Sequence, residues 1–255
     1  MQHYCIKTAF GANFHAPIEE QLEQGITVLD SGCGPGAWVL DMAKQYPQSK
    51  FNGLDISEVF PMEIKPVNAE FQAHNIAHSI PFPDNHFDFI HQRLLVMGLR
   101  ETEWPAVVGN FMRTLKPGGW LELTECTSPE LINRGPKMGI LMDAVNEVAL
   151  AKGLLPNATR HIERFIKEAG FTNIVTQELH TPVNHGNKVG ELLWKDFRML
   201  YTAMRPIIGK AYPEYASEEA YEQFMEDAGE ECKEYKSAFI WVRSYGQKPE
   251  VPTEN

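Results

Sequence analysis

The chain has 255 residues, of which 43% are hydrophobic and 22% are charged, as in an ordinary folded protein. This length fits one medium-sized domain with a sizeable core. The formal net charge is −11, and no run of lysine and arginine occurs. Because nucleic acids and anionic membranes require a basic surface, the composition favours a small-molecule or protein partner instead.

The four cysteines lie far apart in the sequence and form no C-x-x-C pair. This arrangement is typical of reduced intracellular thiols, and it predicts no structural metal site. No apolar run of about 18 residues is present, so we expect no membrane span. Residues 1–14 do not resemble a secretory signal. We therefore expect a cytoplasmic protein, with a nuclear location left open.

Short apolar runs alternate with helical patterns over the first two thirds of the chain, which is typical of a parallel sheet with crossover helices. We expect strands at 26–29, 51–56, 70–76, 87–91 and 120–124, and helices at 37–46 and 104–115. The last third predicts helices at 136–152 and 160–169 and strands at 172–179 and 239–244. The long insertion between those two strands has helical patterns at 189–204 and 218–234. We interpret it as a cap, because insertions of this length are usually functional or form a subdomain.

The segment Val28–Gly36 is the most informative, because a strand runs there into three glycines before a helix. Without Cβ atoms, glycines let backbone N–H groups approach a ligand closely. Gly32, Gly34 and Ala37 also satisfy the loose dinucleotide-binding pattern. The loop alone therefore does not choose the ligand, and a turn without any ligand is a further alternative.

Two acidic residues narrow the choice of ligand. At the end of the first strand, Asp30 would repel a pyrophosphate but suits the cationic ammonium and sulfonium of S-adenosylmethionine (SAM). A simple turn-capping role for Asp30 is the alternative. Asp55 ends the next strand, where a carboxylate can accept both hydroxyls of a ribose. Ile56 can pack on an adenine, and the Asn75 amide can pair with the adenine edge.

These segments together resemble the class I SAM-dependent methyltransferase superfamily. The matching stretches are Val28–Gly36, Gly53–Ser57, Ile80–Asp88 and Leu115–Trp120, in the expected order. The flanking stretches Gly11–Ile18 and Ser244–Pro249 are similar to methyltransferases of fungal secondary metabolism, including the group related to the LaeA regulator.

The resemblance implies an α/β fold: a Rossmann-like, seven-stranded, mostly parallel sheet with helices on both faces and a helical cap insertion. A single domain would comprise an N-terminal lid segment (1–25), a cofactor-binding core (26–180), the cap (181–235) and a last strand (236–246). Tyr4 and Phe14 are the candidate lid residues, with ordinary packing as the alternative for each.

The resemblance also implies the roles of individual residues. The expected cofactor-binding residues are Asp30, Gly32, Gly34, Gly36 and Gln92 at the methionine part, Asp55 at the ribose, and Ile56, Asn75 and Ile76 at the adenine. Many relatives have Asp where this chain has Asn75. Arg93 is open to two interpretations, a ligand-binding residue or a structural ion-pairing residue.

Methyl transfer from a sulfonium depends largely on alignment, and it needs a base only when the acceptor must lose a proton. The catalytic residues are therefore unknown, with His91 and His185 as candidates and a surface or structural histidine as the alternative. His180 and His185 have no third ligand nearby in the sequence, so we expect no metal site.

We expect an enzyme that transfers a methyl group from SAM to a small-molecule, secondary-metabolite acceptor and releases S-adenosylhomocysteine. The alternative is a SAM-binding regulatory protein that acts through protein partners with little or no turnover. A third alternative, an NAD-linked oxidoreductase, is opposed by Asp30. Neither the acceptor atom nor the oligomeric state follows from the sequence.

Overall fold

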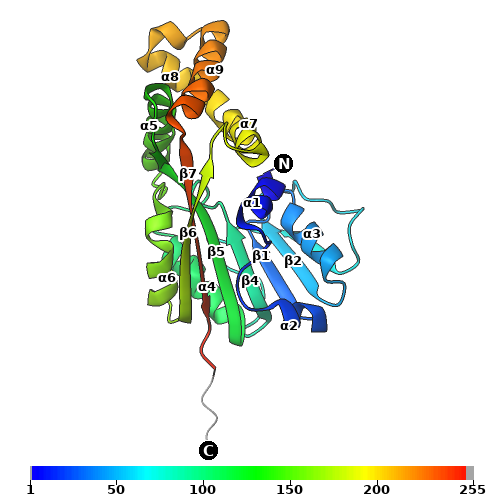
Figure 1. Cartoon of the computed structure of the whole chain (residues 1–255). Helices are drawn as coiled ribbons and strands as arrows, with labels where there is room; N and C mark the ends of the chain where they lie inside the picture. The colour runs from blue at the N-terminus through cyan, green and yellow to red at the C-terminus, as the bar shows by residue number, and fades with distance from the viewer. Residues whose placement is uncertain (1, 251–255) are drawn as a thin grey trace, which may run out of the picture. The chain divides into compact units, whose positions relative to one another are not determined.

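The computed structural model describes residues 2–250, without the side chains of residues 128 and 129. The strands are β1 (Thr27–Ser31), β2 (Lys50–Asp55), β3 (Ala69–Ala73), β4 (Phe87–Arg93), β5 (Leu115–Ile132), β6 (Thr172–Pro182) and β7 (Ala238–Gln247). They form one seven-stranded sheet in the order β3-β2-β1-β4-β5-β7-β6 (Figure 1). The helices are α1 (Gln2–Phe10), α2 (Glu19–Gln24), α3 (Ala37–Gln45), α4 (Trp104–Thr114), α5 (Pro136–Ala151), α6 (Ile162–Glu168), α7 (Lys188–Thr202), α8 (Arg205–Ala211) and α9 (Glu218–Tyr235), with short 3-10 turns at Ala158–Arg160 and Pro213–Tyr215.

The chain divides into two compact units. Unit 1 comprises the chain up to Ala12 together with Cys126–Thr159 and Glu178–Val242, and unit 2 comprises Asn13–Glu125, Arg160–Gln177 and the chain from Arg243 onward. The strands β5, β6 and β7 each begin in one unit and end in the other.

In unit 2, the strands β1 to β4 and the start of β5 are parallel. Val28 pairs with both Phe51 of β2 and Phe89 of β4, and β2 continues the pairing to β3. Parallel strands place their carboxyl ends at one edge of the sheet, which is where open α/β sheets bind ligands. The last strand is antiparallel, because Gln247 lies beside Thr172 whereas Ser244 lies beside Thr176.

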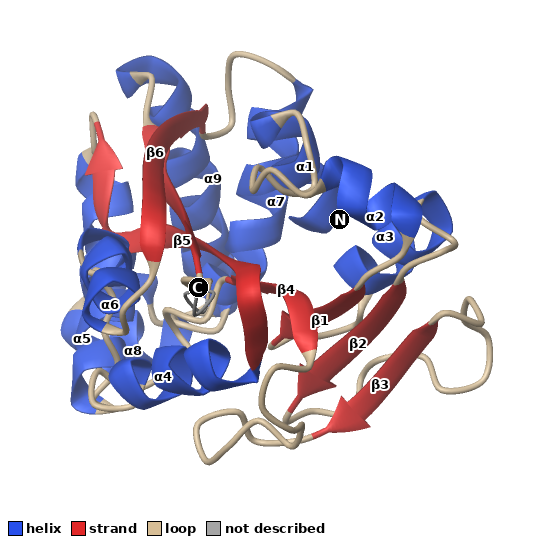
Figure 2. Ribbon diagram, turned by 90° about the horizontal axis from the view of Figure 1, so that it is seen from below, coloured by secondary structure: helices blue, strands red, loops and turns tan. Residues whose placement is uncertain are grey.

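Helices cover both faces of the sheet in unit 2 (Figure 2). On one face, Trp38 of α3 packs with Phe51, Phe71 and Phe89, which the period-2 alternation of the strands points toward it. On the other face, α4 packs on α6, and the rings of Trp104 and Phe165 stack with centroids 5.8 Å apart. Helices therefore shield both faces of the sheet from solvent, as expected for parallel strands.

The segment Lys116–Gly119 leaves the strand ladder. Phe87 pairs with Leu115, but Phe89 pairs with Trp120, so these residues bulge out between the two pairs. The residue after β7 holds this bulge. Lys248 N–H donates to the Gly119 carbonyl at 2.8 Å, and the Lys248 carbonyl accepts from Gly118 N–H at 2.9 Å. The two distant motifs 115–120 and 244–249 therefore form one local structure.

A buried ion pair links β5 to β7 within unit 2. Arg243 Nε lies 3.1 Å from Glu122 Oε1, and the two side chains are 2% and 0% exposed. The other carboxylate oxygen accepts the backbone N–H groups of His15 and Ala16 at 2.7 and 2.9 Å. Arg243 also contacts the His15 ring. The segment before α2 is thereby anchored to the central strands.

Unit 1 is mainly helical, with α5 packed on α9 and α1 packed on α7. Two of its helices have side-chain N-caps, because Asn187 accepts from Gly190 N–H and Ser217 accepts from Ala220 N–H. The helices expected at 189–204 and 218–234 are present as α7 and α9. The helix α5, which we expected within the core, groups with these helices, and the division of the chain into lid, core and cap stays a prediction.

The main differences from the expected elements have local causes. Strand β3 ends at Ala73 rather than 76, because the Asn75 side chain accepts from Ala77 N–H and forms a turn. Strand β5 extends far beyond 124, to Ile132. The patterns did not predict the short helices α2 and α8, which are too short for a clear helical period.

We expect Arg243→Met to lower the free energy of unfolding by about 3 kcal/mol, because Glu122 would remain buried without its counter-ion. Urea unfolding measures this loss. The double change Arg243→Met, Glu122→Gln should be less destabilising than Arg243→Met alone. Arg164→Met, which removes an exposed ion pair with Glu168, should cost less than about 1 kcal/mol. Equal losses for Arg243→Met and Arg164→Met would contradict this account.

Candidate cofactor site

The glycine loop between β1 and α3 has an unusual backbone. Gly32, Gly34 and Gly36 have φ values of +71°, +52° and +75°, a left-handed region that disfavours other residues. The loop is anchored to β2, because the N–H groups of Gly32 and Cys33 both donate to the Leu54 carbonyl, at 2.8 and 2.9 Å. These bonds hold the loop at the carboxyl edge of the sheet.

The surroundings of the three glycines differ. A Cβ on Gly36 would lie 2.5 Å from the Phe71 ring, and one on Gly32 would lie 2.7 Å from Leu95. Around Gly34, by contrast, nothing lies within 4 Å of the corresponding position. The first two glycines therefore allow tight packing, whereas Gly34 presents bare backbone to open space.

The Asp55 carboxylate joins the glycine loop to the turn after β2. Its Oδ2 accepts from Gly34 N–H at 2.7 Å, and its Oδ1 accepts from Ser57 N–H at 2.8 Å. Each carboxylate oxygen retains a lone pair, so the fixed group can still accept from a ligand hydroxyl. Next to it, Ile56 is 70% exposed, which is unusual for a large apolar side chain.

The residues after β3 lie in two different settings. Asn75 Oδ1 is engaged by Ala77 N–H at 3.0 Å, so its amide Nδ2 is the group left to donate outward. Ile76 is only 6% exposed and contributes mainly to packing.

The carboxyl ends of β1 and β4 share a buried pair. Asp30 Oδ1 lies 2.7 Å from His91 Nδ1, and both side chains are nearly inaccessible to water. The His91 ring stacks on Trp38 with centroids 4.0 Å apart and an interplanar angle of 2°. Burial lowers the pKa of His91, while the hydrogen bond that His91 donates to the Asp30 carboxylate opposes this shift. His91 thus connects Asp30 to the first turn of α3.

Gln92 lies on the opposite sheet face from His91. Its Oε1 lies 3.4 Å from Ser31 Oγ, and both residues are fully buried. The Gln92 Nε2 has no hydrogen-bond partner in the part of the chain that the structure describes. It is thus a donor at the carboxyl edge without an acceptor.

Glu125 is a buried residue that the sequence did not identify. Its carboxylate accepts the N–H groups of Leu95 and Val96 at 2.9 and 3.1 Å and so holds the turn that packs on Gly32. Burial raises the pKa of Glu125 to about 8, and the two backbone hydrogen bonds oppose this shift. The sequence signal that could have identified Glu125 is the presence of glutamates within the otherwise apolar run Trp120–Cys126.

Two histidines of unit 1, His185 and His180, have hydrogen-bond partners within that unit. His185 Nε2 donates to the Ser237 carbonyl at 2.8 Å, and the exposed His180 lies 2.6 Å from Glu178 Oε1. Within residues 2–250, no group of three His, Cys, Asp or Glu side chains could hold a metal ion.

The two candidate lid residues differ in burial. Phe14 packs against Tyr46 and Phe89 in the core of unit 2, and Tyr4 of α1 in unit 1 is 60% exposed.

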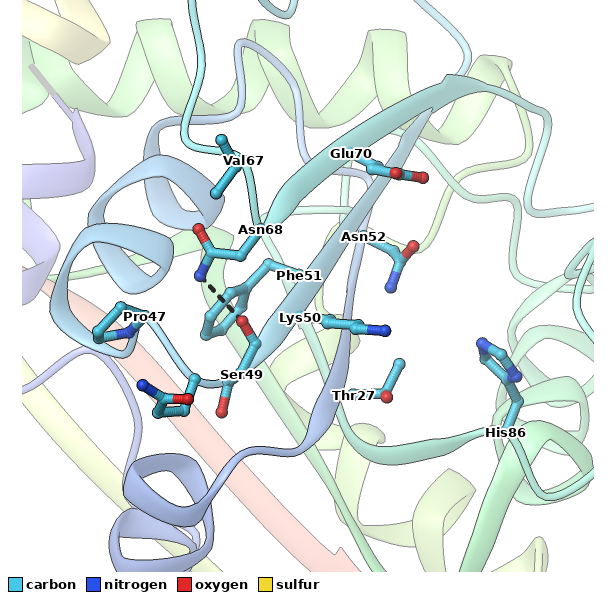
Figure 3. A pocket seen from close by; sticks show the side chains of 11 residues that line it. Thr27, Pro47, Ser49, Lys50, Phe51, Asn52, Val67, Asn68, Glu70 and His86 are labelled. Carbon is cyan, nitrogen blue, oxygen red and sulfur yellow. Dashed lines mark hydrogen bonds between the residues drawn. The ribbon is translucent and has the colours of Figure 1, made fainter.

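A hollow of about 530 Å³ occurs at the amino ends of β1, β2 and β3 (Figure 3). Its lining includes Lys50 and Glu70, whereas the glycine loop lies at the opposite, carboxyl ends of these strands.

We expect Gly36→Ala to destabilise the protein by roughly 2–4 kcal/mol, because it combines a left-handed backbone with overlap against Phe71. The matched change Gly34→Ala should cost only about 1–2 kcal/mol, since it meets open space. Urea unfolding of both variants compares them directly. A larger loss for Gly34→Ala would show that the packing described for Gly36 is not the constraint.

Comparison with known proteins identifies the class. A family described as "Methyltransferase domain" matches residues 28–119. The chain is 26% identical over 260 residues to N-methyltransferase verN of Clonostachys rogersoniana, covering 98% of this chain and 88% of that protein. It is 29% identical over 165 residues to secondary metabolism regulator laeA of Monascus pilosus, covering 61% of this chain and 43% of the regulator.

Among solved structures, mycolic acid cyclopropane synthase CmaA1 in complex with SAH and CTAB has the same fold, with a TM-score of 0.57 at 18% identity. The alignment covers 97% of this chain and 84% of that chain. The match over residues 28–119 and the similarity to an N-methyltransferase over nearly the whole chain bear out the predicted class I SAM-dependent methyltransferase superfamily and its fold. The relatives in fungal secondary metabolism include both an N-methyltransferase and a laeA regulator.

Proposed function

We propose that the carboxyl edge of β1, β2 and β4 in unit 2 binds SAM and that the protein methylates a small secondary metabolite. The observation that carries this proposal is the bare backbone of Gly34, whose N–H is fixed on Asp55 beside the exposed side chain of Ile56. A nucleoside needs these three features together: close approach, a hydroxyl acceptor and an apolar face.

The residues along this edge fit the parts of SAM in order. Asp55 would accept the ribose hydroxyls, and Ile56 would be covered by the adenine. Asn75 would donate through its amide to a ring nitrogen, with Ile76 packed beneath it. The backbone of Gly32, Gly34 and Gly36 would line the methionine part, and the Asp30 carboxylate would attract its ammonium group.

Asp30 and His91 would act together. His91 is buried, stacks on Trp38 and is hydrogen-bonded through Nδ1 to Asp30. This setting favours a role in positioning Asp30, rather than a role as a general base. His185 donates to a backbone carbonyl, which likewise favours a structural role. Gln92 would offer its unpaired Nε2 to the methionine side of the site.

Bound SAM supplies an electrophilic methyl group on a good leaving group. The contribution of the protein is then to align the acceptor and exclude water. A neutral amine can attack without prior loss of a proton, so a nitrogen acceptor needs no dedicated base. The name of verN, an N-methyltransferase, supports nitrogen as the acceptor atom.

Within unit 1, the aromatic and methionine-rich residues of α7 differ in their exposure to solvent. In α7, Trp194 and Tyr201 are 4% and 3% exposed, which favours core packing for them. Met199 is 77% exposed and is available to a ligand or partner. Three further large apolar residues, Phe197, Leu200 and Met204, lie in or directly after α7.

A second candidate function is a SAM-binding regulator that acts through protein partners, which the similarity to laeA supports. No described helix is long and apolar enough to cross a membrane. The net charge of −11 argues against nucleic acid as a partner for either function. We propose a cytoplasmic location, with the nucleus as the alternative if the protein is regulatory.

Calorimetry should detect binding of SAM and S-adenosylhomocysteine but not of NAD. Asp55→Ala should weaken S-adenosylhomocysteine binding at least about 10-fold, because charged hydrogen bonds to the ribose are lost. Glu70→Ala, at an exposed position on β3, is the control and should leave the affinity for S-adenosylhomocysteine unchanged. Binding of NAD without SAM would refute the cofactor assignment.

Turnover separates the enzyme from the regulator. Incubation with methyl-labelled SAM and small-molecule extracts of the producing organism should yield a labelled product, and Asp55→Ala should abolish it. Label that appears only in protein, or in nothing although SAM binds, would favour the regulator.

A further inference from the structure

Arg93 is the last residue of β4, at the carboxyl edge of the sheet. The Cα of His91 is paired with that of Asp30 across β1 and β4. Because side chains two residues apart leave a strand on the same face, Arg93 shares the face of this pair and lies one step nearer the edge. Burial lowers the pKa of Arg93, whereas the nearby Asp30 carboxylate raises it. The two charges therefore lie within electrostatic reach of each other.

Arg93 has no ion pair or hydrogen bond with any side chain that the structure describes, although it is partly buried. Most other arginines of the chain do have a carboxylate partner: Arg100, Arg113, Arg134, Arg164, Arg198, Arg205 and Arg243. A partly buried guanidinium without an acceptor is costly. This argues against the interpretation of Arg93 as a structural ion-pairing residue and leaves a ligand as the source of its acceptor.

Asp30 does not accept a hydrogen bond from the Arg93 guanidinium. Its Oδ1 is bonded to His91 Nδ1, and no hydrogen bond joins Asp30 to Arg93. One carboxylate and one guanidinium thus lie on the same sheet face at this edge. An α-amino acid carries the complementary charges, an ammonium and a carboxylate on one carbon atom.

We propose that Arg93 and Asp30 form a receptor for the amino-acid end of SAM, in which Arg93 binds the α-carboxylate and Asp30 the α-ammonium. This inference rests on the proposed cofactor site. It makes Arg93 a binding residue for the methionine part, held in place by the end of β4. The planar guanidinium of an arginine can donate two parallel hydrogen bonds to a carboxylate. The ammonium group of a lysine cannot match this geometry.

Two ligands that differ only in this end provide the test. S-adenosylhomocysteine has the amino-acid group, whereas 5′-methylthioadenosine has the same nucleoside thioether without it. Arg93→Met should weaken S-adenosylhomocysteine binding roughly 10- to 100-fold in calorimetry and leave 5′-methylthioadenosine binding within about twofold. Arg93→Lys should fall between wild type and Arg93→Met, because it retains the charge but not the fork.

Arg100→Met is the matched control, because Arg100 lies in the loop after β4, is exposed and pairs with Glu103. It should not change either affinity, and thermal melting should show that all variants remain folded. An unchanged affinity of Arg93→Met for S-adenosylhomocysteine would overturn the inference, as would an equal loss for both ligands. Failure of the wild-type protein to bind either ligand would instead refute the proposed cofactor site.

Discussion

The left-handed turn between β1 and α3 is the constraint on which the site depends. Three glycines at positive φ bring the chain back over the sheet edge, and the Leu54 carbonyl receives two of the loop N–H groups. This geometry points Gly34 N–H at Asp55 and packs Phe71 under Gly36. Side chains at these positions would strain or block the turn, so the path of the backbone and the room for a ligand have the same origin.

Buried charge organises the strands around this loop. Asp30, Glu122 and Glu125 are each nearly or fully inaccessible, and each has donors that compensate its burial. Asp30 has His91, Glu122 has Arg243 and two backbone N–H groups, and Glu125 has two backbone N–H groups. Unpaired buried carboxylates would be strongly unfavourable. These groups therefore fix the positions of segments that sequence order leaves far apart.

The glycine loop, Asp55 and the alternating elements were predictable because their signals are local. The turn after β3 was also local, but its Asx geometry shortened the strand relative to the apolar pattern. Contacts that depend on strand register were not predictable. His91 meets Asp30 across 61 positions of sequence, and its stack on Trp38 follows from the way α3 crosses the sheet. The buried setting of Glu125 and the absence of a described side-chain partner for Arg93 likewise depend on residues that are distant in the sequence.

The order of strands in the sheet has a consequence for synthesis of the protein. In the sheet, β7 lies between β5 and β6, and it follows both of them in the sequence. During translation, β5 and β6 therefore emerge long before the strand that separates them. Their backbone edges remain open, and therefore prone to aggregation, until β7 has been synthesised. The backbone hydrogen bonds of Lys248 to Gly118 and Gly119 likewise form only after β7 has been synthesised.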